Sequence, residues 1–203
     1  MTRQYCNQCH FPQTSCVCSA VAPVRSKTEV IVMQHPSEVN HAKNSVRLMP
    51  LVLANMQIVV GETAADFTEL RQYLAQANKP VYIIYPSETS QTVQQSGAQA
   101  DAIIVLLDGT WRKAYRMLQL NPWLQQYPAL HLEVEHASQY VIRKAKRADS
   151  LSTLEAAAFM LSSLDKQLDT SPLLNVFDAM VNLRLQAMPA AVRQRYSLQS
   201  KDE

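Results

Sequence analysis

Residues 103–118, IIVLLDGTWRKAYRML, decide which fold this chain adopts. An apolar run stops at Asp108, the chain turns at Gly109, and a basic helix that carries aromatic residues is predicted from about Thr110. Open α/β sheets bind their ligands where a strand ends and a helix follows at once. A carboxylate at this point is either a turn residue or a ligand-binding residue, and the pattern alone does not separate the two.

Further apolar segments predict strands that alternate with helices along the chain. The predicted strands span residues 29–33, 57–60, 81–85, 102–107 and 130–134. Helices are predicted over residues 38–54, with a kink or break at Pro50, and over residues 63–77. This alternation favours the α/β class, with a mainly parallel sheet covered by helices on both faces.

Two helices are predicted to close the chain. Ser152 and Glu155 fit a capping box, which explains both residues without any function, and their helix is expected to run to about Leu168. Ser171 and Pro172 are predicted as the N-cap and first-turn residues of a second helix, which ends near residue 188.

The composition is that of a globular protein. The chain has 203 residues, of which 47% are hydrophobic and 18% are charged, so one packed domain with a small appendage is expected. No segment resembles a signal peptide or a membrane span, which favours a cytoplasmic protein without a membrane partner. The oligomeric state is not determined by the sequence, and a monomer is the favoured expectation.

The positive charge is unevenly distributed, although the net charge is only +2. One basic cluster follows the central turn, and a second lies about thirty residues later. The clusters consist of Arg112, Lys113 and Arg116, and of Arg143, Lys144, Lys146 and Arg147. Such clusters are typical of a polyanion-binding site, but two solvated faces would give the same pattern.

All four cysteines lie near the N-terminus, with the spacing C-x2-C-x6-C-x-C (Cys6, Cys9, Cys16, Cys18). Four clustered thiols in a reducing compartment indicate a structural zinc site, with a redox or disulfide role as the alternative. His10 could replace one thiolate, although the fourth cysteine makes this unnecessary. We expect a zinc-binding segment over residues 1–26, a catalytic α/β domain over 27–190 and a polar tail over 191–203.

The scarcity of glycine excludes two common nucleotide-binding motifs. Only Gly61, Gly97 and Gly109 are present, so neither a G-x-G-x-x-G fingerprint nor a P-loop can form. This weakens the interpretation of the chain as an ordinary Rossmann dehydrogenase, a Rossmann methyltransferase or an NTPase.

Polar residues follow three of the predicted strands, at positions 35–38, 85–87 and 108–111. In a parallel sheet these positions share the carboxyl edge, which is where ligands bind. Each also has a purely structural explanation: for example, Thr110 could serve only as an N-cap, and Trp111 could belong to the core.

Several motifs occur in a fixed order along the chain. They are the cysteine motif, HPSE at 35–38 followed by Asn44-Ser45, YP at 85–86, LLDGTW at 106–111, YVIRK at 140–144 and LSTLEA at 151–156. Together they resemble the DTW-domain family of tRNA-uridine aminocarboxypropyltransferases, from Cys6 to about Leu168. His41 and Ser45 stand where the family pattern often has Arg and Thr, so neither position is assigned a role.

The resemblance implies S-adenosylmethionine as the donor and a tRNA uridine as the acceptor. The 3-amino-3-carboxypropyl arm would move to uracil N3, giving acp3U, and methylthioadenosine would be released. The family is related to the SPOUT group, so a SPOUT-like knotted fold is implied. In the bacterial branch of the family, the expected uridine lies in the variable loop of the tRNA.

The resemblance also implies roles for individual residues. Asp108 is the predicted catalytic residue, either as the base that takes the N3 proton or as the group that holds the α-amino group of the donor. Residues expected to bind S-adenosylmethionine are Tyr85, Pro86, Ser87, Leu107, Asp108, Thr110, Trp111, Leu151, Ser152, Thr153 and Glu155. Residues expected to bind tRNA are His35, Glu38, Asn44, Arg112, Lys113, Arg116, Arg143 and Lys144.

Two rival functions stay open. A SPOUT-like RNA methyltransferase would use the same donor and release S-adenosylhomocysteine. A zinc-bearing RNA-binding module would carry out no catalysis. An arginine of the basic clusters could also pair with the donor carboxylate and not with a phosphate.

Overall fold

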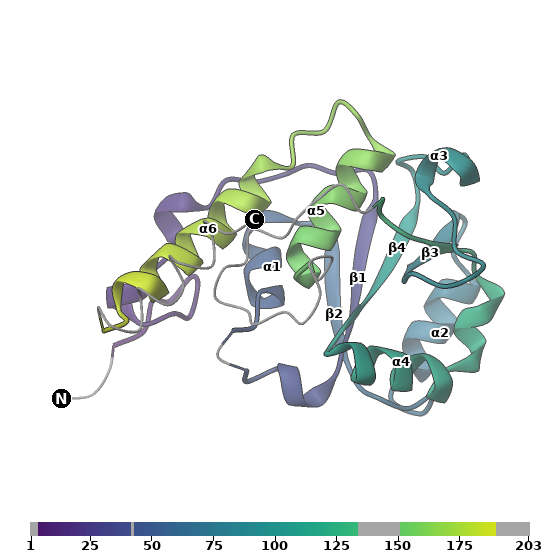
Figure 1. Cartoon of the computed structure of the whole chain (residues 1–203), viewed down its shortest axis with the longest axis horizontal. Helices are drawn as coiled ribbons and strands as arrows, with labels where there is room; N and C mark the ends of the chain where they lie inside the picture. Colours follow the sequence, from purple (N-terminus) through teal and green to yellow (C-terminus); the bar gives the residue numbers. More distant parts are fainter. Residues whose placement is uncertain (1–3, 42, 134–150, 190–203) are drawn as a thin grey trace, which may run out of the picture.

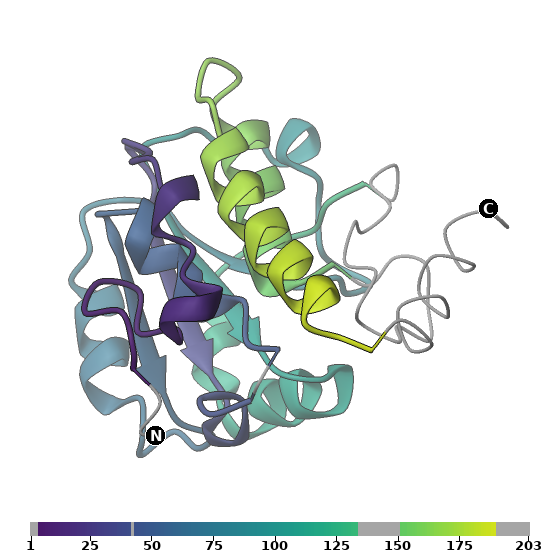
Figure 2. The same cartoon turned by 90° about the vertical axis from the view of Figure 1, so that its left-hand side faces the viewer.

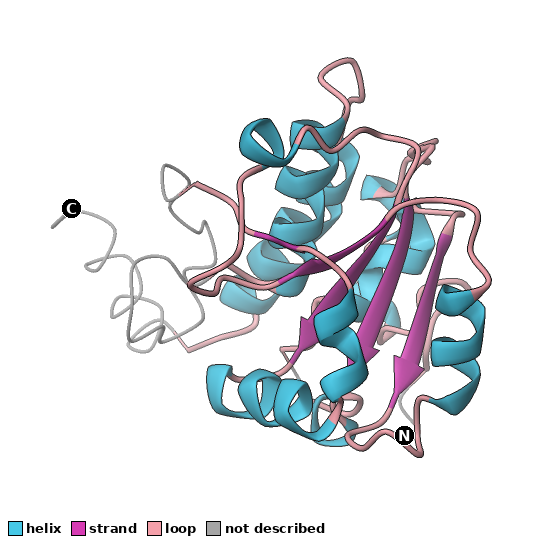
Figure 3. Ribbon diagram, turned by 90° about the vertical axis from the view of Figure 1, so that its right-hand side faces the viewer, coloured by secondary structure: helices cyan, strands magenta, loops and turns pink. Residues whose placement is uncertain are grey.

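All strands of the central sheet run in the same direction (Figure 3). The computed structural model describes residues 4–41, 43–133 and 151–189, and five strands within them form one parallel sheet in the order β2-β1-β4-β3-β5. The strands are β1 (Glu29–Gln34), β2 (Met56–Val60), β3 (Val81–Ile84), β4 (Ile103–Asp108) and β5 (Ala129–Leu130). The α/β class and the parallel sheet predicted from the sequence are therefore confirmed.

Helices and 3-10 turns connect these strands. The α-helices are α1 (Met49–Val52), α2 (Thr68–Ala75), α3 (Val93–Ser96), α4 (Trp111–Leu120), α5 (Thr153–Leu164) and α6 (Ser171–Gln186). The 3-10 turns are η1 (Gln13–Ser15), η2 (Cys18–Ala20), η3 (Pro36–Glu38), η4 (Val46–Leu48) and η5 (Pro122–Gln126). In the described part of the chain, no helix has both the length and the apolar character needed to cross a membrane.

Both faces of the sheet are covered, with α1, α5 and α6 on one face and α2 and α4 on the other (Figure 1). Successive residues of a strand point to opposite faces. Val30 and Val32 of β1 accordingly pack with the first group, and Ile31 and Met33 pack with the second. All four side chains are fully buried, and such burial stabilises the fold by about 1.5–3 kcal/mol per side chain.

The N-terminal segment packs directly against α6 (Figure 2). Phe11, Val17 and Val24 are buried in the same hydrophobic cluster as residues of α5 and α6. The guanidinium of Arg47 lies 3.9 Å from the centre of the Phe11 ring and donates a hydrogen bond to the His10 carbonyl (3.1 Å). The segment and the α/β domain therefore share one core.

The prediction of one helix over residues 38–54 is wrong. The segment instead forms the separate turns η3 and η4 and the short helix α1. Asn44 explains the break, because its side-chain amide donates to the carbonyls of Glu38 and Val39 and its side-chain oxygen accepts from the Val46 N–H. These bonds take the backbone groups that a continuous helix would use. Pro50 lies in the first turn of α1, where its missing N–H has no cost.

Two helix starts also differ from the prediction. Helix α2 begins at Thr68 and not at residue 63, because the Asp66 carboxylate accepts the N–H groups of Glu62 and Thr63 in a turn. These hydrogen bonds lower the pKa of Asp66. In α6, Ser171 is the first helical residue and Thr170 is the N-cap residue, without a side-chain capping bond.

The capping box of α5 is confirmed. The Glu155 N–H donates to Ser152 Oγ (3.2 Å), and the Ser152 N–H donates to Glu155 Oε2 (2.7 Å). The helix ends at Leu164, before the predicted residue 168. Strand β5 is shorter than the predicted strand 130–134, whose last residue lies outside the described residues.

Gly61 provides a test of the packing between β2 and α2. A Cβ atom added to this buried glycine would lie 2.5 Å from Asp66 Cβ and 3.0 Å from the Phe67 ring. Gly61→Ala should therefore lower the free energy of unfolding by about 1–3 kcal/mol, measured by urea denaturation. An unchanged urea midpoint would contradict this account of the turn.

Candidate functional site

The candidate site lies at the carboxyl edge of the sheet, where β1 and β4 are adjacent. The chain leaves β1 toward β2 and leaves β4 toward β5, so the two connections run to opposite sides of the sheet. A crevice at such a topological switch point is where open α/β sheets bind ligands. The last residues of the two strands, Gln34 and Asp108, are paired in register.

Asp108 is held from two sides. The buried Gln34 amide donates to Asp108 Oδ2 (2.8 Å), and the Thr153 hydroxyl donates to Asp108 Oδ1 (2.6 Å). The Asp108 carbonyl also accepts the His35 N–H (2.9 Å). The carboxylate is therefore fixed between β1, β4 and the first turn of α5.

A predominantly apolar cavity of about 250 Å³ lies on one side of the β4–α4 turn. Its lining includes Ile84, Tyr85, Pro86, Leu106, Leu107, Gly109, Trp111, Ala114, Leu130, His131, Leu132, Glu133, Leu151, Thr153 and Ala156. The rings of Tyr85 and Trp111 meet edge to face, with their centroids 6.0 Å apart. We call this space the apolar cavity.

A second cavity of about 210 Å³ is lined by polar and charged groups. Its lining includes Glu38, His41, Lys43, Asn44, Ser45, Asp108, Gly109, Thr110, Lys113, Ser152 and Thr153. We call this space the charged cavity. Gly109 and Thr153 line both cavities, so the two adjoin beside Asp108.

Helix α4 contributes side chains to both cavities. Trp111 lines the apolar cavity and Lys113 lines the charged one, because residues two apart on a helix point about 200° apart. The Thr110 hydroxyl accepts the Lys113 N–H (3.4 Å), which confirms that Thr110 is the N-cap. Trp111 is 43% exposed and is therefore not a core residue.

Two ion pairs join α4 to the neighbouring loops. Lys113 Nζ lies 2.8 Å from Glu38 Oε1 and also donates to Ser37 Oγ. Arg116 Nε lies 2.9 Å from Glu62 Oε1, and His35 Nε2 lies 3.5 Å from the same oxygen. Two of the three cations of α4 are thus paired with carboxylates.

The residues predicted to bind the donor separate into three groups. Tyr85, Pro86, Leu107, Trp111, Leu151 and Thr153 line the apolar cavity, and Asp108, Thr110, Ser152 and Thr153 line the charged cavity. Ser87 lies outside both linings, in an exposed turn where its N–H donates to Ser90 Oγ (2.9 Å). Glu155 also lies outside them and is buried beneath the start of α5.

The residues predicted to bind tRNA do not all lie in one place. Glu38, Asn44 and Lys113 line the charged cavity, where the Asn44 amide is engaged with the backbone of its own loop. His35 and Arg116 contact Glu62, and Arg112 is exposed on the outer side of α4. Arg143 and Lys144 lie outside the described residues.

Sequence reasoning missed several residues of the site. Gln34, which donates to Asp108, is the last residue of a buried strand. A polar residue at the end of a buried strand could have indicated a site residue. His131 follows β5 at the same edge and shares a hydrogen bond with Ser90 Oγ (2.9 Å). Lys43 lies in the charged cavity.

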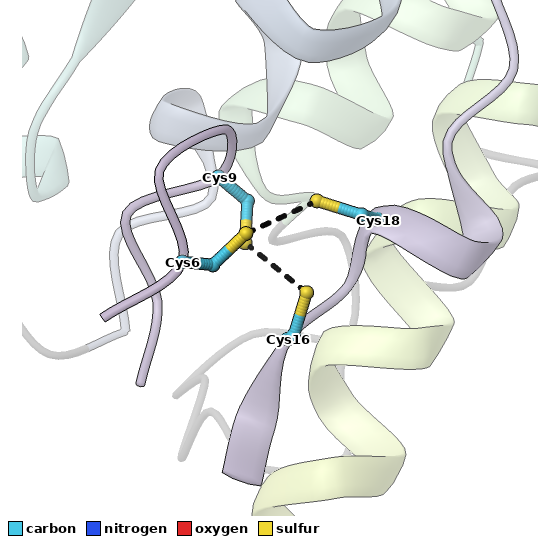
Figure 4. Close-up of side chains that lie close together, drawn as sticks. All are labelled: Cys6, Cys9, Cys16 and Cys18. Atoms are coloured by element: carbon cyan, nitrogen blue, oxygen red, sulfur yellow. Dashed lines mark hydrogen bonds between the residues drawn. The ribbon is translucent and has the colours of Figure 1, made fainter. Parts of the chain in front are cut away.

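The four cysteines form a cluster beside α6 (Figure 4). Cys6 Sγ lies 3.6 Å from Cys18 Sγ, Cys9 Sγ lies 3.7 Å from Cys16 Sγ, and all four sulfur atoms lie within 4.8 Å of one another. Tetrahedral Zn²⁺ with Zn–S bonds of about 2.3 Å places its sulfur ligands about 3.8 Å apart. The four sulfur atoms are therefore arranged to hold one metal ion.

The four thiols of this cluster differ in how readily they lose their protons. The N–H groups of Cys9 and Gln8 lower the pKa of Cys6 to about 6, whereas burial and neighbouring thiols raise the pKa of Cys18 to about 12. Four adjacent thiolates repel one another, and a bound cation offsets this repulsion. His10 adopts a left-handed backbone (φ 56°) after Cys9 and is not part of the sulfur cluster.

Comparison with known protein families accounts for the motif order. The model of the DTW domain matches residues 3–185, which is most of the chain. The chain belongs to the DTW-domain family. This DTW protein matches no solved structure.

Curated relatives of the DTW protein occur in animals and plants. It is 28% identical over 171 residues to the mouse tRNA-uridine aminocarboxypropyltransferase 2, covering 81% of this chain and 57% of the mouse protein. It is 27% identical over 173 residues to the Drosophila melanogaster protein of the same name, covering 81% of this chain and 68% of the fly protein. It is 21% identical over 198 residues to the Arabidopsis thaliana tRNA-uridine aminocarboxypropyltransferase A, covering 80% of this chain and 73% of the plant protein. The chain thus spans little more than half the length of the mouse relative.

The cysteine cluster gives a direct test of metal binding. Cys6→Ser should lower the bound metal content and the melting temperature together, because three thiolates leave the coordination shell incomplete. Metal analysis and thermal unfolding measure the two quantities. His10→Asn is the matched control, since Asn tolerates the left-handed backbone and removes the imidazole, and it should change neither. Unchanged metal stoichiometry in Cys6→Ser would overturn the ligand assignment.

Proposed function

We propose that this DTW protein transfers the 3-amino-3-carboxypropyl group of S-adenosylmethionine to N3 of a uridine in tRNA, releasing methylthioadenosine. The observation that carries the proposal is the meeting of an apolar and a charged cavity beside Asp108. The names of the animal and plant relatives point to the same reaction class.

The two cavities match the two halves of the donor. The flat adenine suits the apolar cavity, which is lined by Tyr85 and the aliphatic residues Leu130 and Leu151. The arm is an α-amino acid with one positive and one negative group. The charged cavity offers the Asp108 carboxylate and the Lys113 ammonium, which a donor carboxylate would share with Glu38. With volumes of about 250 and 210 Å³, the joined cavities are in the range of roughly 300–1,000 Å³ for small-molecule sites.

The reaction is mainly a problem of positioning. Bound S-adenosylmethionine would supply an electrophilic carbon on its sulfonium and a neutral thioether as the leaving group. Walls around the adenosine and the arm would direct the arm carbon, and not the methyl group, toward the uridine for in-line attack. The new bond joins N3 to that carbon, the carbon–sulfur bond breaks with its electrons moving to sulfur, and the N3 proton goes to a base.

Asp108 is the proposed catalytic residue. Uracil N3 carries a proton at neutral pH, so a base within hydrogen-bond reach is needed. Gln34 and Thr153 hold the Asp108 carboxylate in one orientation at the junction of the cavities. The alternative role for Asp108 is to hold the α-amino group of the donor, and the two roles differ in which kinetic constant they affect.

The remaining expectations from the resemblance stand as proposals. Zn²⁺ bound to the four cysteines would stabilise the N-terminal segment, and the exposed cations near the site would contact tRNA phosphates. The SPOUT-like knotted topology stays a proposal from the resemblance. The three-part division at residues 26 and 190, the cytoplasmic location and the monomeric state also stay predictions.

Replacing Asp108 separates its two possible roles. If Asp108 is the base, Asp108→Asn should lower kcat by about 10²–10⁴-fold and leave the Kd for S-adenosylmethionine nearly unchanged. If it holds the α-amino group, the Kd should rise markedly. Asp101→Asn is the control, because Asp101 is exposed and pairs with Lys79 (2.7 Å) far from both linings. If Asp108→Asn has the kcat and Kd of the wild type, Asp108 has neither role in the mechanism.

The small-molecule product decides between the proposed function and its rivals. Incubation of the protein with S-adenosylmethionine and tRNA should release methylthioadenosine and add the mass of the aminocarboxypropyl group to one uridine. Chromatography and nucleoside mass spectrometry measure both products. S-adenosylhomocysteine in place of methylthioadenosine would identify a methyltransferase, and an unchanged nucleoside mass would favour the non-catalytic RNA-binding module.

A further inference from the structure

Helix α4 exposes large side chains that a globular protein usually buries. Of the large hydrophobic side chains exposed in the described residues, three lie on this ten-residue helix: Trp111, Tyr115 and Leu120. Tyr115 is the most exposed of them all, at 57%. Only Ala114 and Met117 of the helix are buried. The outer face of α4 therefore offers aromatic surface to a partner.

Aromatic and basic side chains form two adjacent rows on this face. Trp111 and Tyr115 are four residues apart and so lie on one side of the helix, about 6 Å apart along its axis. Arg112 and Arg116 form the neighbouring row with the same spacing. Arg116 is paired with Glu62, whereas no carboxylate among the described residues forms an ion pair with Arg112.

The aromatic row begins at the apolar cavity. Trp111 lines this cavity and meets Tyr85 edge to face. Tyr115 follows Trp111 by one helical turn on the same side of α4. The exposed aromatic row therefore leads from the rim of the cavity along the outer face of the helix.

We propose that the outer face of α4 is a stacking platform for unpaired nucleotides of an RNA, with Tyr115 stacking on a base and Arg112 contacting a phosphate. The proposal rests on the proposed function in one respect, namely that the substrate is tRNA. Tyr115 would hold a nucleotide next to the uridine that enters the site.

The chemistry of the face favours RNA over a protein partner. Helix α4 carries three basic residues and no acidic one. Lys113 and Arg116 are paired with Glu38 and Glu62, so Arg112 is the cation of this face whose charge complements a phosphate. Aromatic rings stack on any base whose face is free, which restricts the partner to a single-stranded segment. Because Tyr and Trp side chains have only two χ angles each, little side-chain entropy is lost on binding.

The test measures binding of a fluorescent, uridine-containing single-stranded RNA to the full-length protein without any donor. Tyr115→Ala should weaken binding roughly 5- to 100-fold, and Tyr115→Phe should retain the wild-type affinity. An RNA of the same length with abasic riboses should bind Tyr115→Ala and the wild type equally. Arg112→Ala should reduce the salt slope of binding by about 0.7 with both RNAs.

Helix α2 supplies matched controls. Tyr73 is 44% exposed and Arg71 is exposed, and both lie on this helix. Tyr73→Ala and Arg71→Ala should bind RNA as the wild type does. Circular dichroism confirms that each variant is folded before binding is measured.

Two results would overturn the proposal. Tyr115→Ala could bind the base-containing RNA as tightly as the wild type, or it could lose affinity equally for the abasic RNA. In the first case, loss of self-association of Tyr115→Ala in sedimentation would identify α4 as a protein interface.

This test is independent of the test of catalysis. If the protein binds RNA as predicted but forms no acp3U, the stacking platform is supported and the proposed function is rejected. If the protein forms acp3U but Tyr115→Ala binds RNA as tightly as the wild type, only the stacking platform is rejected.

Discussion

The hydrogen bonds that Asp108 accepts from Gln34 and Thr153 join three elements that are distant in the sequence. Gln34 ends β1, Asp108 ends β4, and Thr153 begins α5. Leaving the buried Gln34 amide without its partner would cost about 1–3 kcal/mol. The same contacts therefore stabilise the carboxyl edge of the sheet and fix the position of the proposed catalytic group.

Much of the fold could be predicted from local patterns, because β1 and β4 are continuous apolar runs and Ser152 begins α5 with a complete capping box. The prediction failed over residues 38–54, where the Asn44 side chain takes backbone groups that a helix would use. Hydrophobic periodicity does not reveal such competition between side chain and backbone.

The site was predictable to the extent that strand ends converge in a parallel sheet. Asp108, Tyr85 and Trp111 were placed at the carboxyl edge in this way, and they line the two cavities there. Gln34 and His131 were missed because their contacts depend on strand register and on the crossover that brings β5 beside β3. Neither feature is visible in a local stretch of sequence. The two adjoining cavities likewise draw their linings from several distant segments and not from any single motif.

The central claim is that Asp108 lies where the two halves of one ligand meet. A crystal structure of the protein with bound S-adenosylmethionine tests it most directly. We expect the adenine beside Tyr85 in the apolar cavity and the amino-acid arm in the charged cavity, with the arm carbon next to the sulfonium near Asp108. Adenine bound outside the apolar cavity, or an arm directed away from Asp108, would contradict the claim.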